Sequence, residues 1–308
     1  MELGRRGGAL AAAALVVTWS SGFVGAELGV RGGGSPLALL GWRFALLAVA
    51  LLAVAAVRRM PLSSWRAWAR QGLLALLCQV GYLLLVFEGV ARGVHGGTAA
   101  LIAALQPLLV ATVAGRLLGE RSTPQTWIGM AIGLAGVVVV VSGDLAASSA
   151  PGFAYLLPTA GMLCLAGGTV LTRRLRPPES LMQTVTMQAV VTAVALMGAA
   201  ALTGQAAPPA NGGFWVAVLW LIVLTSLGGY GMYTYLTRTR GATVVSTLLY
   251  LTPPTTMLWV FVMFGEPVTL LGLVGLAIST VGVLLVLRRL PGPSSSSATE
   301  PDPAPSPP

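Results

Sequence analysis

Long apolar runs alternate with short polar segments along almost the whole chain. Each run has about the length that a helix needs to cross roughly 30 Å of hydrocarbon. The ten runs cover residues 9–30, 36–57, 71–90, 97–118, 125–143, 152–172, 180–203, 214–237, 242–264 and 268–287. Because most connections are short, the pattern predicts an all-α integral membrane protein whose ten transmembrane helices pack as neighbours.

The composition agrees with a membrane protein and argues against a soluble one. Hydrophobic residues make up 56% of the 308 residues and charged residues only 9%, whereas a soluble domain has about a quarter charged. The net charge of +9 comes from arginines scattered between apolar runs, which is typical of a membrane surface and not of a nucleic-acid interface. The two cysteines have no zinc or redox spacing. The sequence therefore predicts no metal, no cofactor and no nucleic-acid partner.

The arginines also predict the direction of the helices. With the N-terminus in the cytoplasm, only Arg31 and Arg92 fall on external loops, and Arg43 lies within the second run. The other fifteen fall on the cytoplasmic side: Arg5, Arg6, Arg58, Arg59, Arg66, Arg70, Arg116, Arg121, Arg173, Arg174, Arg176, Arg238, Arg240, Arg288 and Arg289. Since basic residues stay in the cytoplasm during insertion, we expect a multi-pass inner (plasma) membrane protein with both termini cytoplasmic. Residues 1–8 are then a cytoplasmic N-terminus, and the proline- and serine-rich residues 291–308 a disordered cytoplasmic tail.

Two segments of the chain repeat each other without a gap. LQPLLVATVAGRLLGE at 105–120 and LTPPTTMLWVFVMFGE at 251–266 share leucine, proline, glycine and glutamate at a shift of 146 residues. Each half contains five runs. Because an odd number of membrane crossings ends on the opposite side, the second repeat at 152–287 would be inverted relative to the first at 9–143. Inverted repeats are typical of secondary transporters. The match continues at the same shift in the pairs Gly129 and Gly275, Ala131 and Ala277, Ile132 and Ile278, and Gly136 and Gly282.

Small residues four apart recur in the fifth and tenth runs. They are Gly129 with Gly133 and Gly275 with Ser279. Such spacing lets helices approach closely, so we expect close packing here, either between the halves or between protomers of a homodimer.

Several motifs resemble the EamA-type carriers of the drug/metabolite transporter (DMT) superfamily in their ten-helix form. They are TWSSGFVGAE at 18–27, PLALLGWRF at 36–44, GERSTPQTWIGMAIGLAGV at 119–137 and GEPVTLLGLVGLAISTVGV at 265–283. The resemblance covers about residues 9–288. It implies a fold of two five-helix repeats and the export of amino acids or other metabolites.

Two prolines at mid-span point to the substrate path. Proline within a helix frees a carbonyl, which a membrane tolerates only against protein or a watery cavity. Pro107 and Pro253 therefore mark the walls of a central cavity or hinges, with a simple packing kink as the alternative. Nearby hydroxyl, amide and aromatic side chains are suited to a small polar solute, although they also bond neighbouring helices. The substrate-path candidates are Trp19, Ser20, Tyr82, Gln106, Pro107, Tyr230, Tyr233, Tyr250, Thr252 and Pro253.

Charges near membrane depth form a second group of candidates. Arg43 is a functional hypothesis by default, but a structural link to backbone carbonyls or to a carboxylate such as Glu27 is favoured. Glu88, Arg92 and His95 follow one another at helical steps, which indicates an external salt bridge or a proton-responsive gate. Two further glutamates end the matched segments and are expected to lock helix ends and loops. The full set of charged gate or structural candidates is Glu27, Arg43, Glu88, His95, Glu120 and Glu266.

Together these features predict a secondary transporter, an exporter of small polar or amphipathic metabolites such as amino acids that works by alternating access. No GxxxxGK[ST] loop is present for a nucleotide-driven pump, and one histidine without an HExxH motif argues against an enzyme. The alternatives are a passive channel or facilitator and a multidrug or purine efflux carrier of the same fold. The expected partners are a small-molecule substrate and the lipid bilayer, with proton coupling left open.

Overall fold

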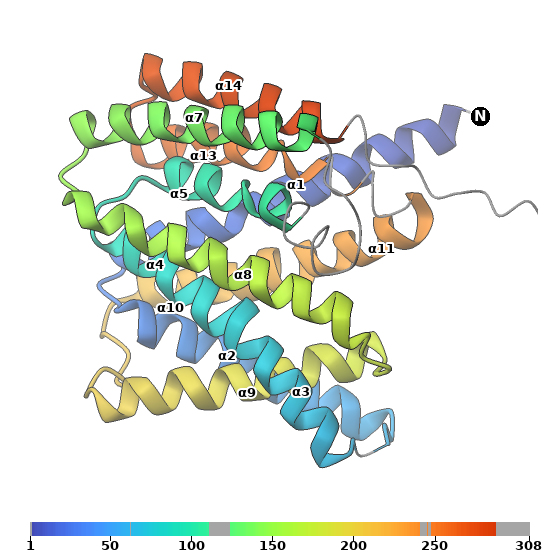
Figure 1. The fold of residues 1–308 in the computed structure, drawn as a ribbon. Helices are drawn as coiled ribbons and strands as arrows, with labels where there is room; N and C mark the ends of the chain where they lie inside the picture. The colour runs from blue at the N-terminus through green and yellow to red at the C-terminus, as the bar shows by residue number, and fades with distance from the viewer. Residues whose placement is uncertain (1, 62, 111–123, 241–244, 246–247, 288–308) are drawn as a thin grey trace, which may run out of the picture.

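The computed structural model describes residues 2–61, 63–110, 124–240, 245 and 248–287. In this part of the chain every regular element is helical, and the helices pack side by side in one bundle (Figure 1). Seven of the described helices are long and apolar enough to cross a membrane, and two shorter apolar helices cover Gly96–Val110 and Leu270–Gly282. The prediction of an all-α membrane protein is therefore confirmed. Glu120 and the predicted tail at 291–308 lie outside the described residues.

The helices of the first half follow the predicted runs. Ser35 starts the second helix, because its hydroxyl accepts a hydrogen bond from the Ala38 N–H and Pro36 occupies the first turn. The third run is one continuous helical span that changes to π-helix in its middle. The elements are α1 (Glu2–Arg31), α2 (Pro36–Val57), α3 (Trp65–Ala75), η1 (π-helix, Leu76–Gly81), α4 (Tyr82–Ala91), α5 (Gly96–Ala103) and α7 (Pro124–Ala147).

The second half has the same order of elements. Its third run also changes to π-helix in the middle, at a place that corresponds to η1. A π-helix in a longer α-helix often marks a functional position. The elements are η2 (3-10 helix, Gly152–Tyr155), α8 (Leu156–Leu175), α9 (Leu181–Leu202), α10 (Gly212–Trp220), η3 (π-helix, Leu221–Gly229), α11 (Tyr230–Arg240), α13 (Thr252–Phe264) and α14 (Leu270–Leu287).

Both matched segments contain a break immediately before the proline. Residues 104–105 form a turn after α5 and helix resumes at Gln106, while residues 250–251 form a turn before α13. Pro107 and Pro253 thus lie in the first turn of a new helix, where a missing N–H costs no hydrogen bond. The chain is thus interrupted just before each proline, at positions 146 residues apart.

Many helices of the first half pack against helices of the second. In the bundle core, glycines permit several of these contacts, such as Gly22 against Thr225 and Gly97 against Met257. The more extensive pairings include α1 with η3, η1 and α4 with α8, α2 with α9, α5 with α13, and α7 with α14. The two halves are therefore interleaved, and neither forms a bundle by itself.

The closest of these pairings, α7 with α14, depends on small residues (Figure 1). A Cβ atom at Gly136 would lie 2.6 Å from the Gly275 carbonyl oxygen, and one at Gly282 would lie 2.5 Å from the Gly129 oxygen. These contacts advance along one helix while they retreat along the other, so the two helices are antiparallel. The predicted small-residue packing is found, and it lies between the halves.

Candidate functional site

Three predicted aromatic residues meet near the middle of the bundle. The Trp19 ring on α1 stacks on the Tyr233 ring of α11, with centroids 5.5 Å apart, and lies 6.2 Å from the Tyr230 ring. Tyr230 and Tyr233 are 6.5 Å apart. We call these three residues the aromatic cluster. Rings with hydroxyl and N–H edges offer both apolar contact and hydrogen bonds to a small ligand.

Arg43 reaches the same region from α2. Its side chain is only 5% exposed, and its Nε and Nη2 donate to the Ser226 hydroxyl at 3.3 and 3.1 Å. Ser226 in turn donates to the Leu221 carbonyl at 3.1 Å, five residues back along π-helix η3. The Arg43 guanidinium also lies within electrostatic range of the Tyr230 phenol. The π-helix therefore presents the hydroxyl that holds this arginine.

The expected link between Arg43 and Glu27 is wrong. Glu27 forms an ion pair with Arg31 one turn further along α1, at 2.9 Å. The i,i+4 neighbour on the same helix is available without bringing two helices together, so it takes the carboxylate. Arg43 Nη1 has no hydrogen-bond partner among the described residues.

Trp42, the residue next to Arg43 near the start of α2, has two contacts of its own. The Trp42 indole N–H donates to the Ala206 carbonyl at 3.0 Å. Its ring also meets Trp215 of α10 edge-on, with centroids 5.3 Å apart. The residue next to Arg43 is thus held on two sides, which limits rotation of α2 about its axis.

Polar side chains hold the two helix breaks. Ser20 of α1 is fully buried and donates to the Thr252 carbonyl at 3.3 Å. Gln106 donates from Nε2 to the Thr169 hydroxyl of α8 at 3.0 Å. The Thr252 hydroxyl itself is buried and has no partner in the described residues. These contacts place three predicted candidates, Ser20, Gln106 and Thr252, at the breaks together with the prolines.

The remaining substrate-path candidates lie outside the aromatic cluster. Tyr250 and Pro253 line a cavity of about 10 Å³ with Leu105 and Ser279, which is too small for a metabolite. Tyr82 begins α4 and is half-buried, and its backbone faces Gly161 of α8. The structure therefore gathers the candidates in two groups, the aromatic cluster with Arg43 and the breaks, with Tyr82 apart on α4.

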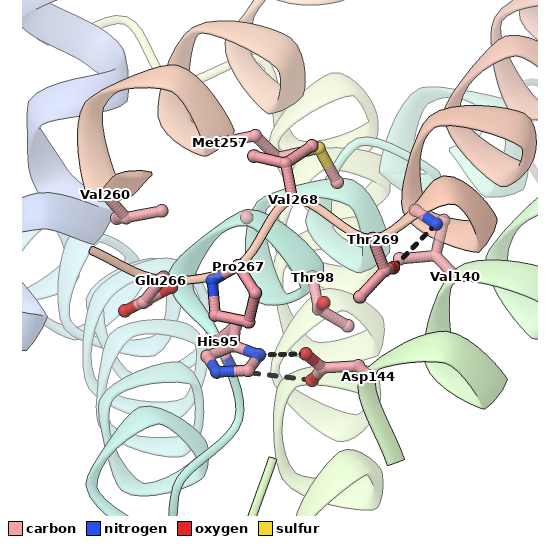
Figure 2. Close-up of a pocket in the computed structure, with 12 residues that line it drawn as sticks. His95, Thr98, Val140, Asp144, Met257, Val260, Glu266, Pro267, Val268 and Thr269 are labelled. Atoms are coloured by element: carbon pink, nitrogen blue, oxygen red, sulfur yellow. Dashed lines mark hydrogen bonds and ion pairs between the residues drawn. The ribbon is translucent and has the colours of Figure 1, made fainter. Parts of the chain in front are cut away.

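A second polar group lies at the opposite end of the bundle from the N-terminus (Figure 2). His95, between α4 and α5, forms a close hydrogen-bonded pair through Nδ1 with Asp144 of α7. The backbone N–H of His95 also donates to Asp144, at 3.4 Å. Tyr155 in η2 donates its hydroxyl proton to Asp144 at 2.8 Å. We call His95, Asp144, Tyr155 and Glu266 the outer cluster.

Glu266 lines the same pocket from the connection between α13 and α14 (Figure 2). It is 9% exposed, and its Oε2 has no hydrogen-bond partner in the described chain. Burial raises the pKa of Glu266 to about 7, although the nearby His95 lowers it. The hydrogen bond to Asp144 raises the pKa of His95. The pocket measures about 30 Å³, enough for water, so the cluster can exchange protons but not house a metabolite.

The predicted grouping of Glu88, Arg92 and His95 is only partly found. Glu88 and Arg92 form an exposed ion pair on α4, whereas His95 turns to Asp144. Asp144 and Tyr155 were missed as candidates. Asp144 follows a long apolar run directly, as Glu27 does, and this position is the signal that could have found it.

A third polar network, also missed, lies nearer the other end of the bundle. Thr192 donates to Gln79, Gln79 to Gln188, and Gln188 to Gln71, each at 2.9 to 3.0 Å. Gln71 donates to Glu179 at 2.9 Å, and Glu179 also pairs with Arg70. This amide chain ties α3 and η1 to α9.

Comparison with known proteins identifies the family to which this chain belongs. The model of the EamA-like transporter family matches the chain twice, at residues 6–142 and 152–288. The chain belongs to the EamA-like transporter family. It is a membrane transporter and not an enzyme, and the predicted family resemblance is confirmed.

Related EamA-family proteins cover most of the chain. It is 28% identical over 279 residues to the uncharacterized inner membrane transporter YedA of Escherichia coli K12, covering 89% of this chain and 88% of that protein. It is also 28% identical to a probable terminal-alkyne amino-acid exporter of Streptantibioticus cattleyicolor, covering 92% and 94%. A solved crystal structure, described only as that of a protein, superposes with a TM-score of 0.61 over 93% of this chain and all of the other, at 23% identity. That similarity concerns the fold.

Proposed function

We propose that this protein is a secondary exporter that works by alternating access of two inverted five-helix repeats, residues 9–143 and 152–287. The observation that carries the proposal is the antiparallel contact of α7 with α14 through corresponding glycines. Gly136 meets Gly275, and Gly129 meets Gly282, so each helix uses the same positions as its counterpart. Two inverted repeats are related by a two-fold axis in the membrane plane, and such an axis would produce this contact.

π-Helices and helix breaks occur at corresponding places in the two halves. Each half has a π-helix in its third run and a break before the proline of its fourth. We propose that these are the hinges. The outer cluster and the Gln71–Gln188 network lie toward opposite ends and would then close the path alternately from the two sides. This arrangement favours a carrier over a channel, which needs a pore and no alternating closure.

The proposed substrate is a small polar or amphipathic metabolite of the amino-acid type. Its proposed site lies between Trp19, Tyr230 and Arg43. The naming of one relative as a probable amino-acid exporter supports this class. The proposed membrane is the inner (plasma) membrane, which agrees with the description of YedA. Both termini are placed in the cytoplasm, because fifteen arginines then lie on that side.

We further propose that protons regulate the outer end. The charged or titratable groups that face His95 and Glu266 are Asp144 from α7 and Glu27 and Arg31 from α1. Because the outer cluster lies at one end of the bundle, it would respond to the pH of the compartment on that side. Protonation favours the arrangement seen here and would keep the outer end closed.

The test is counterflow in liposomes. Purified protein is reconstituted, the liposomes are loaded with a mixed amino-acid pool, and uptake of labelled amino acids is followed with and without a pH gradient. We expect counterflow that is lost in Trp19→Ala. The matched control is Trp65→Ala, because Trp65 is 75% exposed. Flux at electrical rates without counterflow would contradict the proposal and support a channel.

A further inference from the structure

Arg43 carries a positive charge that is buried within the bundle. Its guanidinium is 5% exposed, and it lies in a helix long and apolar enough to span a membrane. Its hydrogen-bond partner Ser226 is a neutral hydroxyl that accepts from both Nε and Nη2, and the guanidinium lies 5.0 Å from the centroid of the Phe44 ring. Nη1 is buried and has no partner among the described residues. A guanidinium carries five donors, so part of its capacity is unused.

No carboxylate in the described chain neutralises this charge. Four acidic residues are engaged by other cations, and Glu266 lies in the outer cluster with His95. The four pairs are Glu27 with Arg31, Glu88 with Arg92, Asp144 with His95, and Glu179 with Arg70. A buried cation without a counter-ion is strongly unfavourable, and an intramembrane charge is retained where it has a function.

The surroundings of Arg43 are those of a ligand site. The Tyr230 phenol lies within electrostatic range of the guanidinium, yet Tyr230 is 43% exposed. Trp19 lies 6.2 Å from Tyr230 across the contact of α1 with α11. A cation without a carboxylate partner among the described residues thus stands beside an aromatic surface. Arginine with a planar fork of donors is the preferred partner of a carboxylate.

We propose that Arg43 binds the carboxylate of the transported substrate, with Nη1 as the free donor and the aromatic cluster as the wall for the substrate's apolar part. The inference rests on the proposed carrier function and narrows its substrate to amphipathic carboxylates such as α-amino acids. Ser226 is a positioning residue, which holds the guanidinium through Nε and Nη2 and leaves Nη1 to the ligand.

The decisive comparison uses the unaltered protein. Its thermal unfolding in detergent, in chloride-free sulfate buffer, is measured with an equimolar mixture of the twenty common L-amino acids. A second sample receives the corresponding α-carboxamides. We expect the acids to raise the melting temperature and the amides to leave it unchanged, because the amide replaces the anionic carboxylate by a neutral group and keeps the amino group and side chain. An equal shift with both mixtures, or no shift with either, overturns the inference.

Variants then assign the effect to Arg43. Arg43→Gln is expected to lose the stabilisation by the acids, whereas Arg92→Gln, which removes an exposed arginine, keeps it. Arg43→Lys retains the positive charge but not the planar fork of donors. This variant should need about ten times more amino acid for the same rise in melting temperature, because one hydrogen bond to a charged group contributes about that much. A folded Arg43→Gln protein that responds to the acids like the wild type contradicts the proposal.

Failure of this inference is distinct from failure of the carrier function. Counterflow of amides or of uncharged solutes with no preference for acids would leave a carrier whose substrate is not a carboxylate. Absence of counterflow with a charge-dependent thermal shift would leave a carboxylate site in a protein that does not transport. The two measurements therefore separate the outcomes.

Discussion

Ser279 of α14 donates a hydrogen bond to the carbonyl oxygen of Gly133 of α7, at 3.1 Å, and the two residues are 146 positions apart in the chain. The shift that relates the two matched sequence segments is the same. Two equivalent positions therefore meet at the contact between the halves. The hydrogen bond is buried, and it crosses between helices whose glycines leave no room for side chains.

Enlarging this contact should destabilise the whole protein. In Gly136→Val the new Cβ would lie 2.5 Å from the Ser279 nitrogen, which the antiparallel pair cannot avoid without separating. We expect a loss of about 1–3 kcal/mol, the usual cost of overpacking, seen as a lower melting temperature in detergent. Gly198→Ala is the control, because its Cβ would meet nothing within 4 Å. A melting temperature equal to that of the control would contradict the role of this contact.

The Ser226 hydroxyl should stabilise the protein because it accepts hydrogen bonds from the buried Arg43 guanidinium. Ser226→Ala removes the acceptor of two hydrogen bonds from buried Arg43. Since hydrogen bonds to charged groups contribute about 1.5–3 kcal/mol, we expect a loss of that size in the free energy of unfolding. Ser142→Ala is the matched control, because the exposed Ser142 hydroxyl bonds only the Val139 carbonyl of its own helix. A loss no greater than in the control would show that Arg43 finds another acceptor.

The positions of the helices were predictable, whereas their local geometry was not. Apolar runs of membrane-spanning length identified the α2 span at 36–57 and placed α9 and α14 within two residues at each end, whereas a turn at 250–251 divides the ninth run. The π-helices Leu76–Gly81 and Leu221–Gly229 leave no such mark, because one extra residue per turn changes no hydrophobic pattern in a helix that is apolar all round.

Candidate residues were predicted better than their partners. Trp19, Tyr230 and Tyr233 were singled out and do lie together. The pairing of His95 with Asp144 joins residues 49 positions apart on different helices, which sequence spacing cannot give. Pairs within one helix, such as Glu27 with Arg31, follow the i,i+4 rule and were accessible from the sequence.

The outer cluster predicts a stability that falls as pH rises. Burial raises the pKa of Glu266 from 4.5 to about 7, so its neutral form is favoured in this arrangement. The stabilisation is fully present below pH 4.5 and is lost as pH rises through about 7. His95, whose pKa is also raised, acts in the same direction. The melting temperature measured between about pH 5 and 9 should therefore decline on the alkaline side.

Glu266→Gln separates this effect from general alkaline sensitivity. The amide stays neutral at every pH, so the variant should lose less stability than the wild type above about pH 7. Glu88→Gln is the control, since Glu88 is paired with Arg92 on the surface of α4. Parallel pH profiles for the wild type and Glu266→Gln would exclude Glu266 as the titrating group.

The amide network should hold α3 to α9 as a unit. Gln71 is fully buried, accepts a hydrogen bond from Gln188 and donates one to Glu179. Gln71→Leu removes one hydrogen bond from Gln188 and one from the charged Glu179, and such bonds contribute about 0.5–1.5 and about 1.5–3 kcal/mol respectively. We therefore expect a large drop in melting temperature.

A double-mutant cycle tests whether the network acts as a unit. Gln188→Leu made alone removes one hydrogen bond from Gln71 and one from Gln79. In the Gln71→Leu background the bond between Gln188 and Gln71 is already absent, so the second substitution removes less. The loss in the double variant should therefore be smaller than the sum of the two single losses, by about 0.5–3 kcal/mol. Additive losses would mean that the amides act independently, and the network could not then serve as a cooperative closure of its end of the bundle.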